Sequence, residues 1–407
     1  MQLDSTLPAD APRFAFITSV LEMGGSTTFL CNLGGELVRR RVPVVVFSFE
    51  RANPLAANFE RLGVPVSVQN QDRLIYEDRI GSILEQLSKF QPTVVVACLS
   101  SVSFEVLRYS PRGVDRVGMV QSDDPGVYRL VRQYAEHMDR VVGVSKTIVE
   151  KLESFPELAD VPSVYGPYGV PMPPQARVRE HTTNNPLRIL YLGRVDDEQK
   201  RVRLFPGILS DLCASRMPFV WTVAGNGPDR SYLERTMVTN DPSQVVRFTG
   251  MVSYERVPEL LESHDVFLLA SDYEGLPLSL LEAMGHGLVP VVSDLPSGVR
   301  EVVDETTGKL VDIHDIPGYA RAILWLHEHR REMTQMAQRA REKVQARFSV
   351  AAMTDRWLEL GQRCKAAEMT WPREFNIEPM MGARRPFYYR EPVRTMRRLR
   401  KKCVRRF

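Results

Sequence analysis

Short apolar runs alternate with longer amphipathic stretches along most of this chain. Several of the runs are apolar nearly throughout, as in parallel strands that are covered on both faces. In the first half they predict strands at 13–20, 42–49, 64–68, 93–99, 116–120 and 140–144. In the second half they predict strands at 187–192, 219–224, 245–248, 266–270, 289–293 and 308–311. The stretches between them have helical periodicity, as in 26–40, so the pattern predicts βα units on parallel sheets.

One stretch, 171–186, breaks the alternation with four prolines among polar residues. We interpret it as a linker between two doubly wound α/β domains, at 1–170 and 187–364, with a C-terminal extension at 365–407. Ligands bind such sheets beyond the carboxyl ends of the strands. We therefore expect two Rossmann-like domains that face a central cleft.

Composition agrees with a folded two-domain protein and adds an asymmetry of charge. The 407 residues exceed what one core supports, and 43% hydrophobic residues exclude wholesale disorder. The net charge of +3 conceals two parts. Residues 384–407 hold eleven Lys/Arg and one acid, a charge of +10. This leaves 42 basic and 49 acidic residues, or −7, for 1–383.

The five cysteines stand far apart and form no CxxC pair, so neither a zinc site nor a disulfide framework is indicated. Cys31 and Cys98 have apolar neighbours and are interpreted as buried space-filling residues. Residues 1–12 contain no apolar run typical of a signal peptide. Nor does any apolar run approach the length of a membrane-spanning helix. We expect a cytoplasmic protein.

The first segment with candidate chemistry follows the first predicted strand and opens a helix. Gly24 and Gly25 lie there, and glycines at a helix N-terminus let backbone N–H groups approach an anion. The alternative is a tight βα turn that binds nothing. The GxGxxG pattern is absent, which disfavours a dinucleotide site.

Two further segments follow strands of the second half. Arg194 and Lys200 are two cations six residues apart after 187–192, an arrangement that suits a diphosphate. The alternative is a solvated charged loop. In 272–284, glycine and proline end a strand, and a helix is expected to begin near Leu278. Glu274 then lies in the loop and Glu282 about one turn inside the helix, so the two carboxylates are not a coupled acid/base pair.

These segments, in this order, resemble the family-four retaining glycosyltransferases of the GT-B fold. The resemblance covers roughly 12–364 and includes the 224–228, 248–250 and 290–293 segments. It implies a nucleotide-sugar donor bound mainly by the C-terminal domain, with Arg194 and Lys200 on its diphosphate and Glu274 beside the transferred sugar. The donor-binding residues that it implies are Gly24, Gly25, Gly193, Val252, Gly275, Leu276, Pro277, Leu278 and Glu282. No cofactor is expected, and because the two cations do the charge work of a divalent ion, we expect no metal.

The sequence departs from the family pattern after the strand 116–120. Many members carry a histidine there, near the reacting sugar, whereas this chain has Gln121, which cannot transfer a proton. Gln121 and Asp123 are candidate acceptor-side residues, although Asp123 or Asp124 capping the next helix is the favoured alternative. His286 is interpreted as a packed residue at a helix end.

Residues 365–407 follow the part of the chain that resembles the family. In 393–407 apolar residues recur at helical spacing among basic ones, a pattern that predicts an amphipathic helix on an anionic membrane surface. A solvated tail is an equal alternative, and nonspecific nucleic-acid contact is a weaker one. We expect no specific nucleic-acid partner.

The resemblance implies a retaining, metal-independent hexosyltransferase with a UDP or GDP donor. Its acceptor would be a glycan or glycolipid in cell-surface polysaccharide or glycolipid assembly, and it would be cytoplasmic or peripheral on the inner face of the membrane. The alternatives are a GT-B-like binding subunit with weak catalysis and a sugar-nucleotide epimerase of related fold. Gln121 favours the binding subunit, whereas Arg194, Lys200, Glu274 and Glu282 favour the enzyme.

Overall fold

The computed structural model describes residues 11–49, 55–68, 76–98, 100–174, 185–239, 241, 244–362, 371, 372, 375 and 377. The chain divides into two compact units, each built on a parallel β-sheet. The first unit comprises Met1–Val144, Ile148–Gly166 and Thr354–Phe407. The second comprises Ser145–Thr147 and Pro167–Met353.

The described strands of the first unit form a seven-stranded sheet in the order β3-β2-β1-β4-β5-β6-β7, with every neighbouring pair parallel. The strands are β1 (Phe14–Thr18), β2 (Val44–Ser48), β3 (Val66–Val68), β4 (Val94–Cys98), β5 (Asp115–Val120), β6 (Arg140–Gly143) and β7 (Ser163–Tyr165). The six predicted strands are confirmed. The sequence did not predict β7, because its three residues are half-buried at the sheet edge and make no apolar run.

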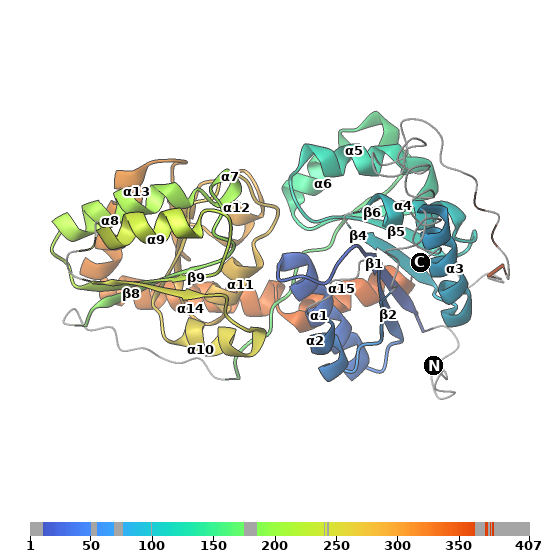
Figure 1. Cartoon of the computed structure of the whole chain (residues 1–407), viewed down its shortest axis with the longest axis horizontal. Helices are drawn as coiled ribbons and strands as arrows, with labels where there is room; N and C mark the ends of the chain where they lie inside the picture. The colour runs from blue at the N-terminus through green and yellow to red at the C-terminus, as the bar shows by residue number, and fades with distance from the viewer. Residues whose placement is uncertain are drawn as a thin grey trace, which may run out of the picture. The chain divides into compact units, whose positions relative to one another are not determined.

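Helices cover both faces of this sheet, with α1 and α2 on one side and α3 and α4 on the other (Figure 1). The helices of this part of the chain are α1 (Gly25–Arg39), α2 (Ala56–Arg61), α3 (Tyr76–Phe90), α4 (Ser101–Tyr109), α5 (Pro125–Gln133) and α6 (Lys146–Glu153), with short 3-10 turns η1 (Ala135–His137) and η2 (Pro156–Leu158). Cys31 and Cys98 are buried, and burial raises the pKa of each thiol to about 12, which confirms them as buried space-filling residues.

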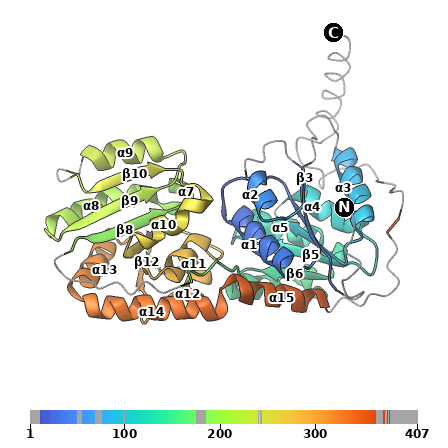
Figure 2. The same cartoon turned by 90° about the horizontal axis from the view of Figure 1, so that it is seen from below.

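The last long helix, α15 (Val350–Gln362), belongs to the first unit from Thr354 onward. Its Trp357 is 2% exposed and packs with ring centroids 6.3 Å from Phe14, 5.5 Å from Phe16 and 5.9 Å from Phe29. Figure 2 shows α15 running beneath the first sheet. The predicted boundary of the second domain at 364 is therefore corrected, because these aromatic contacts draw the helix into the first core.

The boundary before the second unit also differs from the prediction. The chain enters this unit at Pro167. Val170, predicted to be the last residue of the first domain, pairs with Ser349 in an isolated bridge and therefore lies inside the second unit. Of the predicted linker 171–186, residues 175–184 lie outside the described residues.

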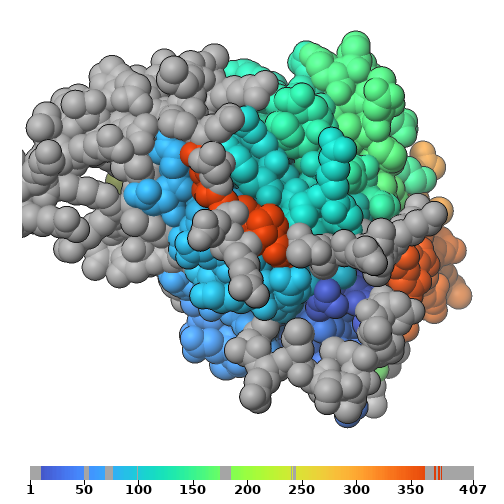
Figure 3. Space-filling view, turned by 90° about the vertical axis from the view of Figure 1, so that its right-hand side faces the viewer, coloured from blue at the N-terminus to red at the C-terminus, as the bar shows by residue number. Residues whose placement is uncertain are grey.

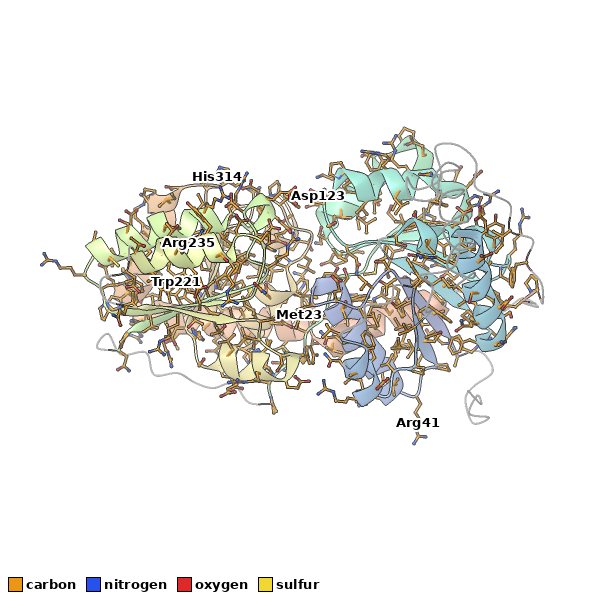
Figure 4. All side chains as sticks on the ribbon, in the orientation of Figure 1. Met23, Arg41, Asp123, Trp221, Arg235 and His314 are labelled. Carbon is orange, nitrogen blue, oxygen red and sulfur yellow. The ribbon has the colours of Figure 1, made fainter. Side chains whose placement is uncertain are left out.

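In the second unit the described strands form a six-stranded parallel sheet in the order β10-β9-β8-β11-β12-β13. The strands are β8 (Leu187–Leu192), β9 (Phe219–Ala224), β10 (Val246–Gly250), β11 (Val266–Leu269), β12 (Val289–Ser293) and β13 (Lys309–Val311). All six were predicted. Trp221 of β9 is buried inside this unit with its ring centroid 5.2 Å from that of Phe205 (Figure 4).

Helices α8, α9 and α13 lie over one face of the second sheet and α10, α11 and α14 over the other (Figure 1). The helices are α7 (Asp197–Lys200), α8 (Phe205–Ala214), α9 (Arg230–Thr239), α10 (Val257–Glu262), α11 (Leu278–Gly285), α12 (Gly298–Val302), α13 (Ile316–Glu328) and α14 (Arg330–Arg347), with 3-10 turns η3 (Val202–Leu204) and η4 (Tyr254–Arg256). Among the helices that the structure describes, none combines the length and hydrophobicity needed to cross a bilayer.

Each sheet has a point at which the strand order reverses. In the first it lies between β1 and β4, and in the second between β8 and β11. The loops that follow such neighbouring strands leave in opposite directions and open a crevice at the carboxyl edge. The segments that follow β8 and β11 carry Arg194, Lys200 and Glu274, so the topology places the predicted catalytic residues at this crevice.

Candidate functional site

An ion pair between Lys200 and Glu274 forms the centre of the site in the second unit. The carboxylate of Asp196 accepts hydrogen bonds from the N–H groups of Glu198 and Gln199 and so caps α7, whose last residue is Lys200. Lys200 Nζ lies 2.5 Å from Glu274 Oε1, and the two side chains are 15% and 7% exposed. The topology thus brings together two residues that are 74 positions apart in the chain.

Further contacts hold the Glu274 loop against α7. Ser271 Oγ donates a hydrogen bond of 2.6 Å to Glu274 Oε1, the oxygen that also meets Lys200. The backbone N–H of Asp272 donates to Gln199 O at 2.9 Å, and Gln199 Nε2 donates to Tyr273 O at 3.1 Å. The carboxylate is therefore preorganised.

Asp272 extends this network toward solvent. Arg201 and His314 both contact its carboxylate, the His314 Nε2 at 2.7 Å. Burial works to raise the pKa of Asp272, but the hydrogen bonds from Arg201 and His314 prevail and lower it. This carboxylate is therefore ionised and holds the loop from its outer side, while Ser271 and Lys200 hold Glu274.

Arg194 lies on the loop between β8 and α7 with its side chain 59% exposed, and its guanidinium is 3.0 Å from Asp196. The Tyr191 hydroxyl donates a hydrogen bond of 2.5 Å to the Arg194 carbonyl and fixes the backbone there. Burial, and then the nearby Glu274 and Asp196 carboxylates, raise the pKa of Tyr191, so it remains a neutral donor. Arg194 therefore combines a fixed backbone with a guanidinium open to a ligand.

Glycines let the loops after β8, β9 and β10 pack backbone against backbone. Gly225 has a φ of 138°, and a Cβ there would lie 1.8 Å from the Gly193 carbonyl oxygen. A Cβ on Gly227 would lie 2.1 Å from the Val195 carbonyl oxygen. The N–H of Gly225 also donates to Gly250 O at 2.8 Å. The motif glycines at 225 and 227 are thus explained by loop packing, and Gly193 lies at the centre of it.

The segment after Glu274 is buried from Gly275 to Leu278, and the Gly275 carbonyl accepts the N–H of Gly298 at 2.9 Å. Leu276 and Leu278 are 3% and 6% exposed. Pro277 stands at the N-cap of α11 without a side-chain capping bond, and α11 begins at Leu278 as predicted. Its first-turn N–H groups therefore receive no cap from that side chain.

Glu282 lies one turn inside α11, and burial raises its pKa to about 7. At the end of the same helix, His286 Nδ1 lies 2.9 Å from Glu282 O, which confirms His286 as a packed helix-end residue. After β10, Met251 is 65% exposed and precedes Val252, the residue expected beside the nucleotide base.

In the first unit, Gly24 is not required by the fold itself. Its φ of 168° is extended backbone, and a Cβ built on it meets nothing within 4 Å. Its carbonyl accepts the N–H of Thr28 at 3.0 Å and so starts α1. The neighbouring Met23 is 45% exposed (Figure 4). The tight-turn alternative therefore does not explain why position 24 is a glycine.

The two aspartates after β5 have different roles. Asp124 caps α5, accepting the N–H of Gly126 at 2.7 Å and of Val127 at 3.2 Å, which confirms the capping interpretation for this residue. Asp123, labelled in Figure 4, accepts the Tyr128 hydroxyl at 2.7 Å and Lys151 Nζ at 2.5 Å. Its carboxylate already has two partners within the domain, so its acceptor-side role stays a prediction.

Gln121 is the first residue after β5 and is 6% exposed. Neither its Oε1 nor its Nε2 has a hydrogen-bond partner among the described residues. A buried amide with both atoms unsatisfied is costly, so this side chain has donor and acceptor capacity that the fold does not use.

Sequence reasoning missed the residues that position the site. Ser271, Gln199 and Tyr191 each hold a predicted residue or its loop, yet each is a single polar residue without a motif. Within the described ranges, no three His, Cys, Asp or Glu residues gather as metal ligands. The expectation that no metal or cofactor takes part stays a prediction.

Comparison with known families agrees with this fold and motif order. Residues 186–329 match the model of glycosyl transferases group 1, and residues 23–164 match that of glycosyltransferase family 4. Two parallel Rossmann-like units of this kind define the GT-B class of proteins. Within that class, the chain belongs to the group 1 and family 4 glycosyltransferases.

Among curated relatives, the chain is similar to the amylovoran biosynthesis glycosyltransferase AmsK of Erwinia amylovora, 29% identical over 177 residues (41% of this chain and 42% of that protein). It is 31% identical over 172 residues to the putative colanic acid biosynthesis glycosyltransferase WcaL of Escherichia coli K12 (40% of this chain and 42% of that protein). The chain therefore spans less than half the length of these relatives.

Solved structures show the same fold at low sequence identity. The pneumococcal O-GlcNAc transferase GtfA, in complex with UDP and GlcNAc, has a TM-score of 0.71 at 11% identity, covering 87% of this chain and 99% of that one. Anabaena Alr3699/HepE, in complex with UDP and glucose, has a TM-score of 0.68 at 15% identity, covering 86% and 99%.

Proposed function

We propose that this chain is a retaining glycosyltransferase that moves a hexose from a nucleoside-diphosphate sugar to a glycan or lipid-linked acceptor. The observation that carries the proposal is the Lys200–Glu274 pair, with a buried carboxylate and a half-buried ammonium, at the point where the strand order of the second sheet reverses. The names of the relatives, which refer to amylovoran and colanic acid biosynthesis, favour a transferase in polysaccharide assembly over an epimerase. UDP in two similar structures favours a uridine or related donor.

In this proposal the donor diphosphate lies between Arg194 and Lys200. A lysine ammonium has three N–H donors, and Glu274 takes one of them, so the other two remain for phosphate oxygens. The hard step is departure of the nucleoside diphosphate as the sugar gains positive charge. Preorganised cations near the leaving group stabilise that transition state without reorganising.

The remaining donor contacts follow from the backbone. The first-turn N–H groups of α11 and the Gly275–Pro277 backbone are assigned to the sugar and phosphate, and Glu282 to the ribose hydroxyls. Gly24 and Gly25 are assigned to the diphosphate, which the open space beside Gly24 at the start of α1 supports. Because Gln121 cannot accept the proton of the acceptor hydroxyl, that proton passes to the leaving phosphate.

A donor screen combined with matched ion-pair variants tests the assignment. The screen measures thermal shifts and donor hydrolysis with UDP-glucose, UDP-galactose, UDP-GlcNAc and GDP-mannose. We expect one nucleotide to raise the melting temperature. Lys200→Ala and Glu274→Gln should lower turnover at least about 100-fold, the scale for loss of an oriented charge-stabilising group, while the protein stays folded.

Arg188→Ala is the matched control. Arg188 and Asp265 form an ion pair of 2.7 Å between the same two strands, β8 and β11, but at their amino ends. This variant should lose stability and keep turnover. Full turnover in both Lys200→Ala and Glu274→Gln would overturn the site. If EDTA abolished turnover and added metal restored it, the prediction of metal independence would be wrong.

A further inference from the structure

Two residues beside the candidate site have a backbone conformation that is unfavourable for residues with a Cβ. Among the described residues, six other than glycine have a positive φ: Arg41, Gln91, Arg201, Arg216, Gln244 and His314. Four of them lie two or three residues before a strand, in turns that lead from a helix into the sheet. One of these turns follows α3, which contributes to the light-blue surface in Figure 3. Arg201 (φ 49°) and His314 (φ 68°) instead lie on the segments that follow β8 and β13, at the carboxyl edge of the second sheet.

Both residues bind the carboxylate of Asp272. Arg201 Nε and Nη2 contact Asp272 Oδ2, and Nε2 of His314, which Figure 4 labels, lies 2.7 Å from Oδ1. Because this carboxylate has a lowered pKa and is ionised, it is the acceptor and His314 Nε2 is the donor. Each carboxylate oxygen thus has a partner from a different segment of the chain. We call Arg201, Asp272 and His314 the clasp.

The clasp lies alongside the Lys200–Glu274 pair and links the same two segments of the chain. Arg201 is the neighbour of Lys200, and Asp272 is two residues before Glu274. His314 adds a third segment, the turn between β13 and α13, to this connection. Left-handed backbone at residues other than glycine persists only where the surrounding structure holds it, and it gathers at functional sites. Here two such residues meet on the loop that carries Glu274.

In the proposed function the Lys200 ammonium binds two anions, the Glu274 carboxylate at 2.5 Å and the donor diphosphate. We propose that Arg201 and His314 are positioning residues, which act through Asp272 to keep Glu274 in place when Lys200 also binds the diphosphate. The inference rests on the proposed function and deepens it. Neither residue needs to touch the donor, because each acts on the loop through the Asp272 carboxylate.

The loss of His314 should therefore slow the reaction more than it weakens donor binding. Donor binding is assigned to Arg194 and Lys200, which are unchanged in His314→Ala. The rate depends on where Glu274 lies, because a misplacement of about 1 Å can cost about 100-fold. We expect kcat for donor hydrolysis to fall about tenfold in His314→Ala and KM for the donor to change less than about twofold. Initial rates with UDP-glucose, UDP-galactose, UDP-GlcNAc and GDP-mannose measure both.

Three further variants separate positioning from general stability. His314→Gln keeps an amide N–H donor that can replace the imidazole Nε2, so it should restore much of kcat. His314→Gly removes the imidazole but suits a φ of 68°, so it should melt at a higher temperature than His314→Ala and have the same low kcat. Adding His314→Ala to Asp272→Asn should lower kcat no further than Asp272→Asn alone, because His314 acts through that carboxylate.

Arg321→Ala is the matched control. Arg321 Nη2 lies 3.0 Å from Asp315 Oδ2, an exposed ion pair on the residue that follows His314. Neither partner belongs to the Glu274 loop, so this variant should keep the wild-type kcat. A fall in kcat as large as that in His314→Ala would overturn the assignment, because any disturbance of this turn would then suffice.

Hydrogen exchange of residues 271–277 reports on the clasp without any reaction. The Asp272 N–H donates to Gln199 O at 2.9 Å, so it exchanges only when the loop leaves α7. In His314→Ala and His314→Gly, exchange in this segment should be faster than in wild type, with and without UDP. Exchange in β9 should be unchanged, because that strand is distant in sequence from the loop and buried in the sheet.

Wild-type kcat in both His314→Ala and His314→Gly, or unchanged exchange at 271–277 in both, would overturn the positioning role. A kcat that follows the melting temperature across all variants would overturn it as well, since it would show a structural effect alone. A protein that hydrolyses no sugar nucleotide would refute the proposed function, and hydrogen exchange would still decide whether the clasp holds the Glu274 loop.

Discussion

At the residue scale, the Gln121 side chain is buried with neither amide atom paired among the described residues. Each unsatisfied buried polar group costs about 1–3 kcal/mol. If the fold needed only a residue to fill this space after β5, an apolar side chain in place of Gln121 would make the protein more stable. The donor and acceptor atoms of this amide suit the hydroxyls of a sugar, which supports its assignment to the acceptor side.

Gln121→Met should therefore raise the stability of the protein and also lower its activity. The apolar side chain has nearly the same volume and removes the unsatisfied amide, so the melting temperature should rise by about 2–4 °C for each kcal/mol gained. The ratio kcat/KM should fall, because KM should rise for the substrate whose sugar the amide contacts, either the donor or the acceptor. Thermal unfolding and initial rates with donor and acceptor varied separately measure both effects.

Gln86→Met provides the comparison for this change. The Gln86 amide is already paired, with Ser67 Oγ at 2.5 Å and the Ser82 carbonyl at 3.4 Å. The same substitution there should lower stability and leave kcat/KM unchanged. A Gln121→Met variant that is less stable than wild type and fully active would show that the buried amide serves packing alone.

Two ion pairs link β8 and β11 or the segments that flank them, and their positions separate a structural pair from one with a proposed chemical role. Arg188–Asp265 lies at the amino ends and Lys200–Glu274 at the carboxyl ends. Each pair joins one basic to one acidic side chain, so charge alone does not distinguish them. Only the second lies where a parallel sheet with a reversed strand order opens a crevice, so only its cation is placed to meet a ligand.

At the scale of elements, α15 closes the first core although it follows the second unit in sequence. Trp357 packs against Phe14 and Phe16, which lie two positions apart on β1 and so share a face, and against Phe29 of α1. The last helix is thus a structural part of the first unit.

Trp357→Ala should destabilise the first unit by about 3–5 kcal/mol, the usual cost of removing a fully buried tryptophan. Denaturant unfolding followed by far-UV circular dichroism should show an earlier first transition. Trp325→Ala is the control, because Trp325 is half-buried between Lys309 and His329 in the second unit. Trp325→Ala should have a smaller effect, on the unfolding transition of the second unit. An equal loss of stability in both variants would contradict the role of α15 in the first core.

At the scale of the whole molecule, the net charge of +3 is the sum of an acidic body and a tail of +10. Arg194 and Lys200 have a proposed chemical role because of where they lie in the candidate site, and not because of how many cations the body carries. The membrane contact predicted for 384–407 depends instead on the number of charges, because basic residues near an anionic surface add their attractions within a Debye length.

Deleting residues 384–407 should abolish pelleting with phosphatidylglycerol-containing vesicles and leave donor hydrolysis unchanged. Binding of the full chain should weaken steeply as salt is raised from low to physiological ionic strength, since the interaction is screened. Co-sedimentation across a salt series measures both. Equal pelleting with and without the tail would exclude it as the membrane contact.

The sequence by itself determined the positions of twelve strands, the order of the motifs and the start of α11, because these depend on local periodicity and on glycine and proline. Tertiary structure alone decided what joins across the chain: the contact of Lys200 with Glu274, the support of that contact by Ser271, and the packing of Trp357 and Trp371 on the first unit. It also left both amide atoms of Gln121 without a hydrogen-bond partner among the described residues. Periodicity reports which face of an element is buried, but pairing over long sequence distances depends on strand order and on the space left by neighbouring side chains.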